Sequence, residues 1–318
     1  MKCSLLMIVA IFLPLGACAD AGESMTEATI SQEIPEDVQE LLRGSVKNQV
    51  FVKGGGFQMG DFGTYITKKS FNEGSFDYKY VDKDHPDAMW LPWLRPDFDL
   101  KKQTSEPVHK VTLSSYSIGK YEVTFSEYDV YTRSEGKATL AEHKIGKQSR
   151  RPKNPAHMMT WENARNYCLW LGKHTGLSFD LPTEAQWEYA ARSRGRDVAY
   201  GTDSGMPQKG TNINSSLGVK KVGSYPPNPL GLYDMSGNAK EWVLDWFDPD
   251  YYKVSPENNP KGPKQGEKRV VRSAKVVLKR LHEKPKADPD TAKEFGFKGH
   301  AYVGFRCAVN EEKPVTLK

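Results

Sequence analysis

The sequence has 318 residues, a formal net charge of +5, 38% hydrophobic residues and a mean hydropathy of −0.64. Its one long apolar run lies at the N-terminus, so a protein that crosses the membrane several times is excluded. The positive charge is small for this length and no nucleic-acid-binding motif accompanies it, so no nucleic acid partner is expected.

The first 17 residues are predicted to be a signal peptide. Lys2 gives a positive start, and an apolar run extends from Leu5 to Leu15. A helix needs about 20 residues to cross the hydrocarbon core of a bilayer, so this run is too short to span it. The run ends in Leu-Gly-Ala before Cys18, which resembles the bacterial lipobox. Cys18 is therefore expected to be acylated; the alternative is an ordinary signal peptide in which Cys18 has no role.

Acylation of Cys18 would determine where the protein lies. Each buried methylene of an acyl chain contributes ~0.8 kcal/mol, so several chains hold a protein on a membrane almost permanently. The sequence thus predicts a lipid-anchored protein of the bacterial cell envelope that faces the periplasm. Ala19, in place of an aspartate after Cys18, favours the outer membrane.

Residues 18–45 are predicted to be an acidic tether, and residues 46–318 a single folded domain. The tether is polar and shows little apolar periodicity except around Val38 to Leu42, where the pattern allows one short helix. From Val50 the pattern becomes strand, glycine turn and strand, and residues 61–107 form an aromatic, loop-like insertion. Strand-like runs follow at 108–113 and 116–123, and brief apolar runs occur at 219–222, 270–278 and 302–309.

Three helices are predicted, over residues 125–131, residues 160–174 and the segment after Thr183. Thr124 and Thr183 are suitable N-caps, and Gln186 lies at the reciprocal capping position of the third helix. Much of the chain after Arg192 consists of glycine, proline and asparagine turns with short apolar runs. Regular structure is therefore sparse, and the pattern predicts an α+β fold with low strand content.

A series of segments resembles the formylglycine-generating, or sulfatase-modifying factor, family in composition and order. They are residues 56–60 (GFQMG), 118–124 (IGKYEVT), 161–168 (WENARNYC), 181–192 (LPTEAQWEYAAR), 222–228 (VGSYPPN), 231–235 (GLYDM) and 304–307 (GFRC). The resemblance implies a loop-rich α+β domain related to C-type lectins. Function needs a separate argument, because one fold can carry several functions.

Cysteine usage indicates both a disulfide and a missing active site. Cys168 and Cys307 are the only cysteines after the N-terminal segment, and an even pair in an exported chain favours a bridge. The resemblance pairs the same two residues. It also implies that catalytic relatives bind copper through two cysteines, at positions that correspond to Leu278 and Glu283. Neither residue offers the sulfur that copper(I) prefers, so no copper is expected.

The resemblance further implies a structural calcium site in residues 234–242 (DMSGNAKEW). Its ligands would be the side chains of Asp234 and Glu241 and the backbone carbonyls of Gly237 and Ala239. Gly237, Ala239 and Glu241 are spaced by two, so an extended chain directs their oxygens to one side, and oxygen ligands suit Ca²⁺. The alternative is a structural turn in which Glu241 forms a salt bridge.

A run of basic residues lies where the resemblance places the family's substrate groove. The candidate groove residues are Arg269, Arg272, Lys275, Lys279 and Arg280. A basic groove would favour an acidic partner, whereas the alternative is a solvated charged face.

Together these features predict a non-catalytic envelope lipoprotein that binds a periplasmic protein partner as a scaffold or as a toxin-immunity-like inhibitor. The alternative is a periplasmic maturation enzyme similar to the pyoverdine chromophore maturation protein. No P-loop, Gly-x-Ser-x-Gly or His-Glu-x-x-His pattern occurs, so phosphoryl transfer, serine hydrolysis and zinc proteolysis have no support.

Overall fold

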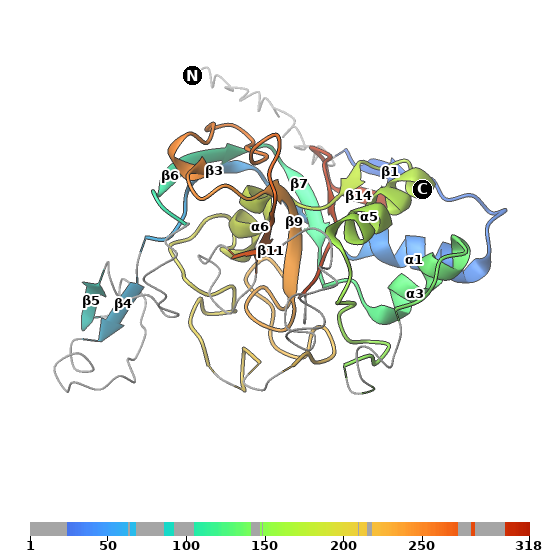
Figure 1. The fold of residues 1–318 in the computed structure, drawn as a ribbon, viewed down its shortest axis with the longest axis horizontal. Coiled ribbons are helices and arrows are strands. Elements are labelled where there is room, and N and C mark those ends of the chain that lie inside the picture. Colours follow the sequence, from blue (N-terminus) through green and yellow to red (C-terminus); the bar gives the residue numbers. More distant parts are fainter. Residues whose placement is uncertain are drawn as a thin grey trace, which may run out of the picture.

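Short strands and helices separated by long loops make up the chain in a computed structural model (Figure 1). It describes residues 24–62, 64–67, 86–91, 105–140, 147, 149–208, 210–214, 218–272, 281–283 and 303–318. The helices are α1 (Glu36–Lys47), α3 (Phe125–Ser134), α5 (Trp161–Thr175), α6 (Glu184–Ala191) and the 3-10 turn η1 (Tyr251–Lys253). The expected α+β class is confirmed.

Two four-stranded sheets form the centre of the fold. One has the order β2-β7-β13-β8 and the other β11-β10-β9-β12; three two-stranded pairs, β3-β6, β4-β5 and β1-β14, complete the set. The strands are β1 (Thr26–Ala28), β2 (Gln49–Val52), β3 (Gly55–Met59), β4 (Thr64–Thr67), β5 (Ala88–Leu91), β6 (His109–Leu113), β7 (Tyr116–Gly119), β8 (Phe179–Asp180), β9 (Lys240–Trp246), β10 (Arg269–Arg272), β11 (Leu281–Glu283), β12 (Val303–Gly304), β13 (Ala308–Val309) and β14 (Val315–Leu317).

The expected acidic tether over residues 18–45 is wrong from residue 24 onward, because this segment is folded into the domain. Strand β1 pairs in parallel with β14 near the C-terminus. Helix α1 follows, and its apolar side chains Val38, Leu41 and Leu42 are buried in the core. Glu36, Asp37 and Glu40 occupy the solvent side of this amphipathic helix, so the acidic composition of the segment conceals the buried apolar face.

The three predicted helices are confirmed, with ends that differ by a few residues. Thr124 and Thr183 each form a capping box, with Glu127 and Gln186 respectively. Thr160 caps α5, which ends at Gly176 in the left-handed conformation with φ 73°. In the part of the chain that the structure describes, no helix is both long and apolar enough to cross a membrane.

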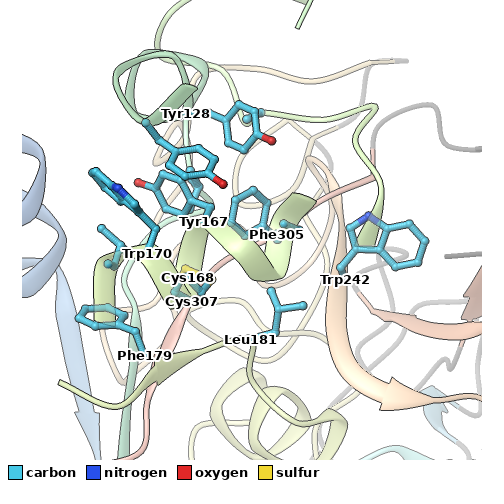
Figure 2. Packing of buried hydrophobic residues seen from close by; sticks show 14 of the residues in the cluster. Tyr128, Tyr167, Cys168, Trp170, Phe179, Leu181, Trp242, Phe305 and Cys307 are labelled. Carbon is cyan, nitrogen blue, oxygen red and sulfur yellow. A yellow bond between two sulfur atoms is a disulfide. The ribbon is translucent and has the colours of Figure 1, made fainter. Parts of the chain in front are cut away.

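The predicted disulfide between Cys168 and Cys307 is present, with the two Cα atoms 5.6 Å apart. It joins α5 to the segment before β13 and lies in a buried cluster with Tyr167, Trp170 and Phe305 (Figure 2). The bridge closes a sequence separation of 139 residues. Restricting so long a loop lowers the entropy of the unfolded chain, by an amount worth about 5 kcal/mol in the loop-closure account.

Candidate functional site

The predicted calcium loop leads directly into β9. Its backbone takes left-handed conformations at Asp234 (φ 58°), Gly237 (φ 97°) and Asn238 (φ 59°). Glycine and asparagine tolerate this region better than most residues. The loop therefore winds tightly over residues 234–238 before the chain becomes extended at Lys240.

Glu241 follows this loop in β9, and its side chain is fully buried. Its carboxylate accepts hydrogen bonds from two residues, Arg306 and Trp187. Arg306 donates from Nε to Oε2 and from Nη2 to Oε1, both at 2.8 Å. Trp187 donates from Nε1 to Oε2, also at 2.8 Å. These contacts agree with the alternative given in the sequence analysis, a structural turn in which Glu241 forms a salt bridge. Each carboxylate oxygen retains further acceptor capacity, because an ionised carboxylate offers about four lone-pair sites.

Two further carboxylates belong to this site, Asp234 in the loop itself and Glu122 from a distant segment. Asp234 accepts the N–H of Gly223 at 2.7 Å. Glu122, which precedes α3 in sequence, accepts the N–H of Ala239 at 2.8 Å and the side-chain amide of Asn238 at 2.6 Å. Glu122 was missed by the sequence analysis as a site residue. It lies more than a hundred positions from the loop, and its only signal was its place in the IGKYEVT segment.

Negative charge exceeds positive charge in this cluster of Glu122, Asp234, Glu241 and Arg306. Burial raises the pKa of the Asp234 carboxyl to about 6, and the neighbouring Glu241 adds to the rise. Burial, followed by the charges of Asp234 and Glu241, raises the pKa of Glu122 well above its ordinary value. A divalent cation bound at the loop would offset this repulsion, so the charge of the donor set fits calcium.

The side chains alone do not form a metal site. Among the residues that the structure describes, no three His, Cys, Asp or Glu side chains converge as metal ligands. A calcium ion would therefore depend on the backbone carbonyls of Gly237 and Ala239 together with Asp234 and Glu241. This ligand set stays a prediction.

Asp234→Asn tests calcium binding, because an asparagine can still accept the N–H of Gly223 while the charge is removed. We expect calcium to raise the melting temperature of the wild type and not that of the variant; a site at a hundred times its Kd gains about 2.7 kcal/mol. In chelator we expect the variant to melt at a higher temperature than the wild type.

The reason is the raised pKa of Asp234 in the folded protein. Asp234 stabilises the fold below about pH 4, and this stabilisation is lost as pH rises through about 6.

The control for this prediction is Asp250→Asn, at an exposed carboxylate paired with Lys253. Thermal melts of all three proteins at pH 7.5, with calcium and with chelator, give the comparison. A wild type that melts at one temperature in both buffers would refute the calcium site.

Arg272 does not belong to an exposed basic groove, which corrects the sequence analysis. Its side chain is fully buried and donates to Glu184 at 3.0 Å and to Glu188 at 2.8 Å. Glu188 also accepts from Arg192 at 2.8 Å. The alternating charges neutralise one another in the interior, and together they tie β10 to α6.

Arg269 is also withdrawn from solvent. Its guanidinium carbon lies 3.5 Å from the ring centroid of Trp161 and 3.4 Å from that of Trp246, so the group is enclosed between two indoles. It donates to the carbonyl of Leu244 at 2.7 Å, and burial lowers its pKa to about 10. The other candidate groove residues, Lys275, Lys279 and Arg280, lie outside the described residues.

The chain matches the family described as sulfatase-modifying factor enzyme 1-like domain over residues 35–311. It belongs to this family. The formylglycine-generating enzyme of Streptomyces coelicolor is 35% identical over 180 residues, which cover 50% of this chain and 53% of the enzyme.

Two other comparisons define how far the likeness extends. A Chlamydia pneumoniae protein named serine/threonine-protein kinase pkn1 is 33% identical over 227 residues, which are 64% of this chain and 34% of that protein. The chain thus spans about a third of the kinase's length. The structure of PvdO from Pseudomonas aeruginosa has a TM-score of 0.55 at 22% identity, covering 82% of this chain and 93% of PvdO. This likeness confirms the fold.

Proposed function

We propose that this family member is an envelope lipoprotein that acts by binding a periplasmic protein partner, as a scaffold or a toxin-immunity-like inhibitor, and not by copper-dependent oxidation. One observation carries the proposal. The segment 269–283 contains no cysteine, and the two body cysteines, Cys168 and Cys307, are joined in a buried disulfide.

Copper(I) prefers soft sulfur ligands, and the two cysteines of the catalytic relatives supply them as thiolates. The position that corresponds to the first family cysteine holds Leu278, whose side chain has no ligand atom, and the second position holds Glu283, a hard oxygen donor. The sulfurs of a closed disulfide are not thiolates, so Cys168 and Cys307 cannot replace the missing pair. A family domain without its reactive sulfurs keeps a large folded surface, which supports a binding role.

The maturation-enzyme alternative rests on a likeness to PvdO at 22% identity, which extends to the fold and not to chemistry. Among the described residues, no group of three or more His, Cys, Asp or Glu side chains is placed to hold a metal ion. The binding role is therefore the function proposed.

Cys18→Ser tests the anchor on which this location depends. We expect the wild type to fractionate with membranes, to carry the added mass of acyl chains, and to sediment with the outer membrane. The serine variant has no thiol to acylate, so it should appear in the soluble periplasmic fraction. Ser4, another small polar residue of the leader, provides the control through Ser4→Ala. Membrane fractionation that is the same for Cys18→Ser and the wild type, without lipid mass on either, would remove the anchor from the account.

A further inference from the structure

Three lysines and three tyrosines form a surface beside the predicted calcium loop, on segments that approach each other where Gly223 lies against the Tyr121 ring. We call it the lysine–tyrosine surface; its residues are Lys120, Tyr121, Lys220, Lys221, Tyr225 and Tyr233. It is built from the chain after β7, from residues 220–225 and from Tyr233. None of these residues has a role in the copper chemistry or in the predicted calcium ligands.

Ring contacts connect one half of the surface. The rings of Tyr121 and Tyr233 have centroids 4.9 Å apart, and Nζ of Lys120 lies 5.6 Å and 5.5 Å from them. Gly223 packs against this pair: a Cβ at that position would come within 2.7 Å of the Tyr121 ring. On the other half, Nζ of Lys220 lies 3.0 Å from the Tyr225 hydroxyl. The lysines thus lie on or beside aromatic faces.

The three lysines of the surface are not paired with nearby acids. Within the described part of the chain, Lys120, Lys220 and Lys221 form no salt bridge. The neighbouring carboxylates, Asp234 and Glu122, accept backbone or amide donors of the adjacent loops. Lys220 and Lys221 are exposed to solvent. The surface therefore presents an unpaired cationic field.

The loop that carries these lysines is fixed in place. The N–H of Lys220 donates to the side chain of Asn238 at 2.8 Å, that of Val222 to the carbonyl of Lys153 at 3.0 Å, and that of Gly223 to Asp234 at 2.7 Å. A surface that is already ordered loses little conformational entropy when it binds a partner. Asp234 and Asn238 also belong to the predicted calcium loop, so the lysine–tyrosine surface and that loop are held by the same hydrogen bonds.

We propose that the lysine–tyrosine surface binds an acidic segment of the partner protein, an inference that rests on the binding role proposed above. Complementary charge steers such a segment to the lysines, and tyrosine rings supply contact area at low conformational cost. A cavity of about 60 Å³ adjoins the surface; Lys120, Tyr121 and Val222 lie in its wall together with Glu122 and Glu127, so an uncharged side chain of the segment would suit it better than an acidic one. That volume accepts a few waters or one small side chain.

The composition of the surface favours a protein segment over a lipid bilayer. Interfacial membrane binding needs large apolar side chains that enter the acyl region as well as basic residues. Among the described residues, the large exposed apolar side chains are Met25, Val108, Leu169 and Val254, and none of them belongs to this surface.

The test uses the full chain in detergent and a fluorescein-labelled hexaglutamate peptide, with an uncharged Gly-Ser peptide as reference. Binding is followed by fluorescence anisotropy at two salt concentrations. The test variant is Lys220→Glu with Lys221→Glu, because both side chains are exposed. The matched control is Lys261→Glu with Lys313→Glu, which makes the same change of charge at exposed lysines on other loops.

We expect hexaglutamate to bind the wild type and the control with similar affinity, and the test variant about tenfold more weakly. Added salt should weaken binding, because exposed charges are screened. Equal loss in both variants, or equal binding of the uncharged peptide, would overturn the proposal. So would lysine-dependent binding to phosphatidylglycerol vesicles without binding of hexaglutamate. Each of these failures leaves the absence of copper chemistry untouched, so the two proposals fail separately.

Discussion

Replacing Arg306 with methionine is expected to lower the free energy of unfolding by about 3–5 kcal/mol. Arg306 is fully buried and donates to both oxygens of Glu241, and it also donates to the carbonyls of Gly119 and Tyr233. Methionine fills part of the volume but leaves buried Glu241 without its cation. It also removes the positive charge that opposes the repulsion among Glu122, Asp234 and Glu241.

The loss of unfolding free energy in the Arg306→Met variant should increase with pH. Without Arg306 the pKa values of the Glu122 and Asp234 carboxyls rise further, so the variant carries the cost of ionising them as pH increases. The destabilisation should therefore be larger at pH 8 than at pH 5. Urea unfolding at the two pH values, followed by tryptophan fluorescence, measures it.

Arg133→Met is the matched control, because Arg133 pairs with Asp37 on the surface with both side chains more than half exposed. Exposed pairs contribute about 0–1 kcal/mol. Arg306→Lys keeps the charge but not the two-pronged geometry, and it provides a measurable intermediate in case the methionine variant does not fold. An Arg306→Met cost no greater than that of Arg133→Met would contradict this view of the cluster.

Local signals in the sequence predicted the helices and the disulfide well. Thr124 and Thr183 are capping residues whose partners lie three positions away, so the motif is complete within one turn. The ordered family segments predicted the fold and the pairing of Cys168 with Cys307, because they place α5 and the last segments in a known arrangement.

Long-range pairings could not be predicted in the same way. Glu122 meets the loop at Ala239, and Arg272 meets Glu184, across separations that no local pattern records. Arg269 and Arg272 have the composition of a solvated basic run, and only the fold shows that ion pairs and indoles enclose them. The segment 24–45 was mistaken for a tether because its acidic residues concealed one apolar helical face.

Copper-dependent oxidation of the family's kind needs a pair of thiolates, and we expect none after the N-terminal segment. Cys168 and Cys307 bridge α5 to the segment before β13 and are buried among aromatic side chains (Figure 2). Residues 269–283 contain no cysteine, and Cys18 is expected to be acylated. The chain is therefore expected to offer no thiolate pair to copper(I), with or without bound calcium.

The most direct measurement is therefore an oxidation assay. The full chain, loaded with copper(I) in the presence of oxygen, is incubated with a cysteine-containing peptide, and mass spectrometry follows conversion of the thiol to an aldehyde. The formylglycine-generating enzyme of Streptomyces coelicolor is the positive control. The account predicts that this chain converts no more peptide than copper alone, and that it retains no stoichiometric copper after gel filtration. Peptide aldehyde formed above the copper blank, together with retained copper, would contradict it.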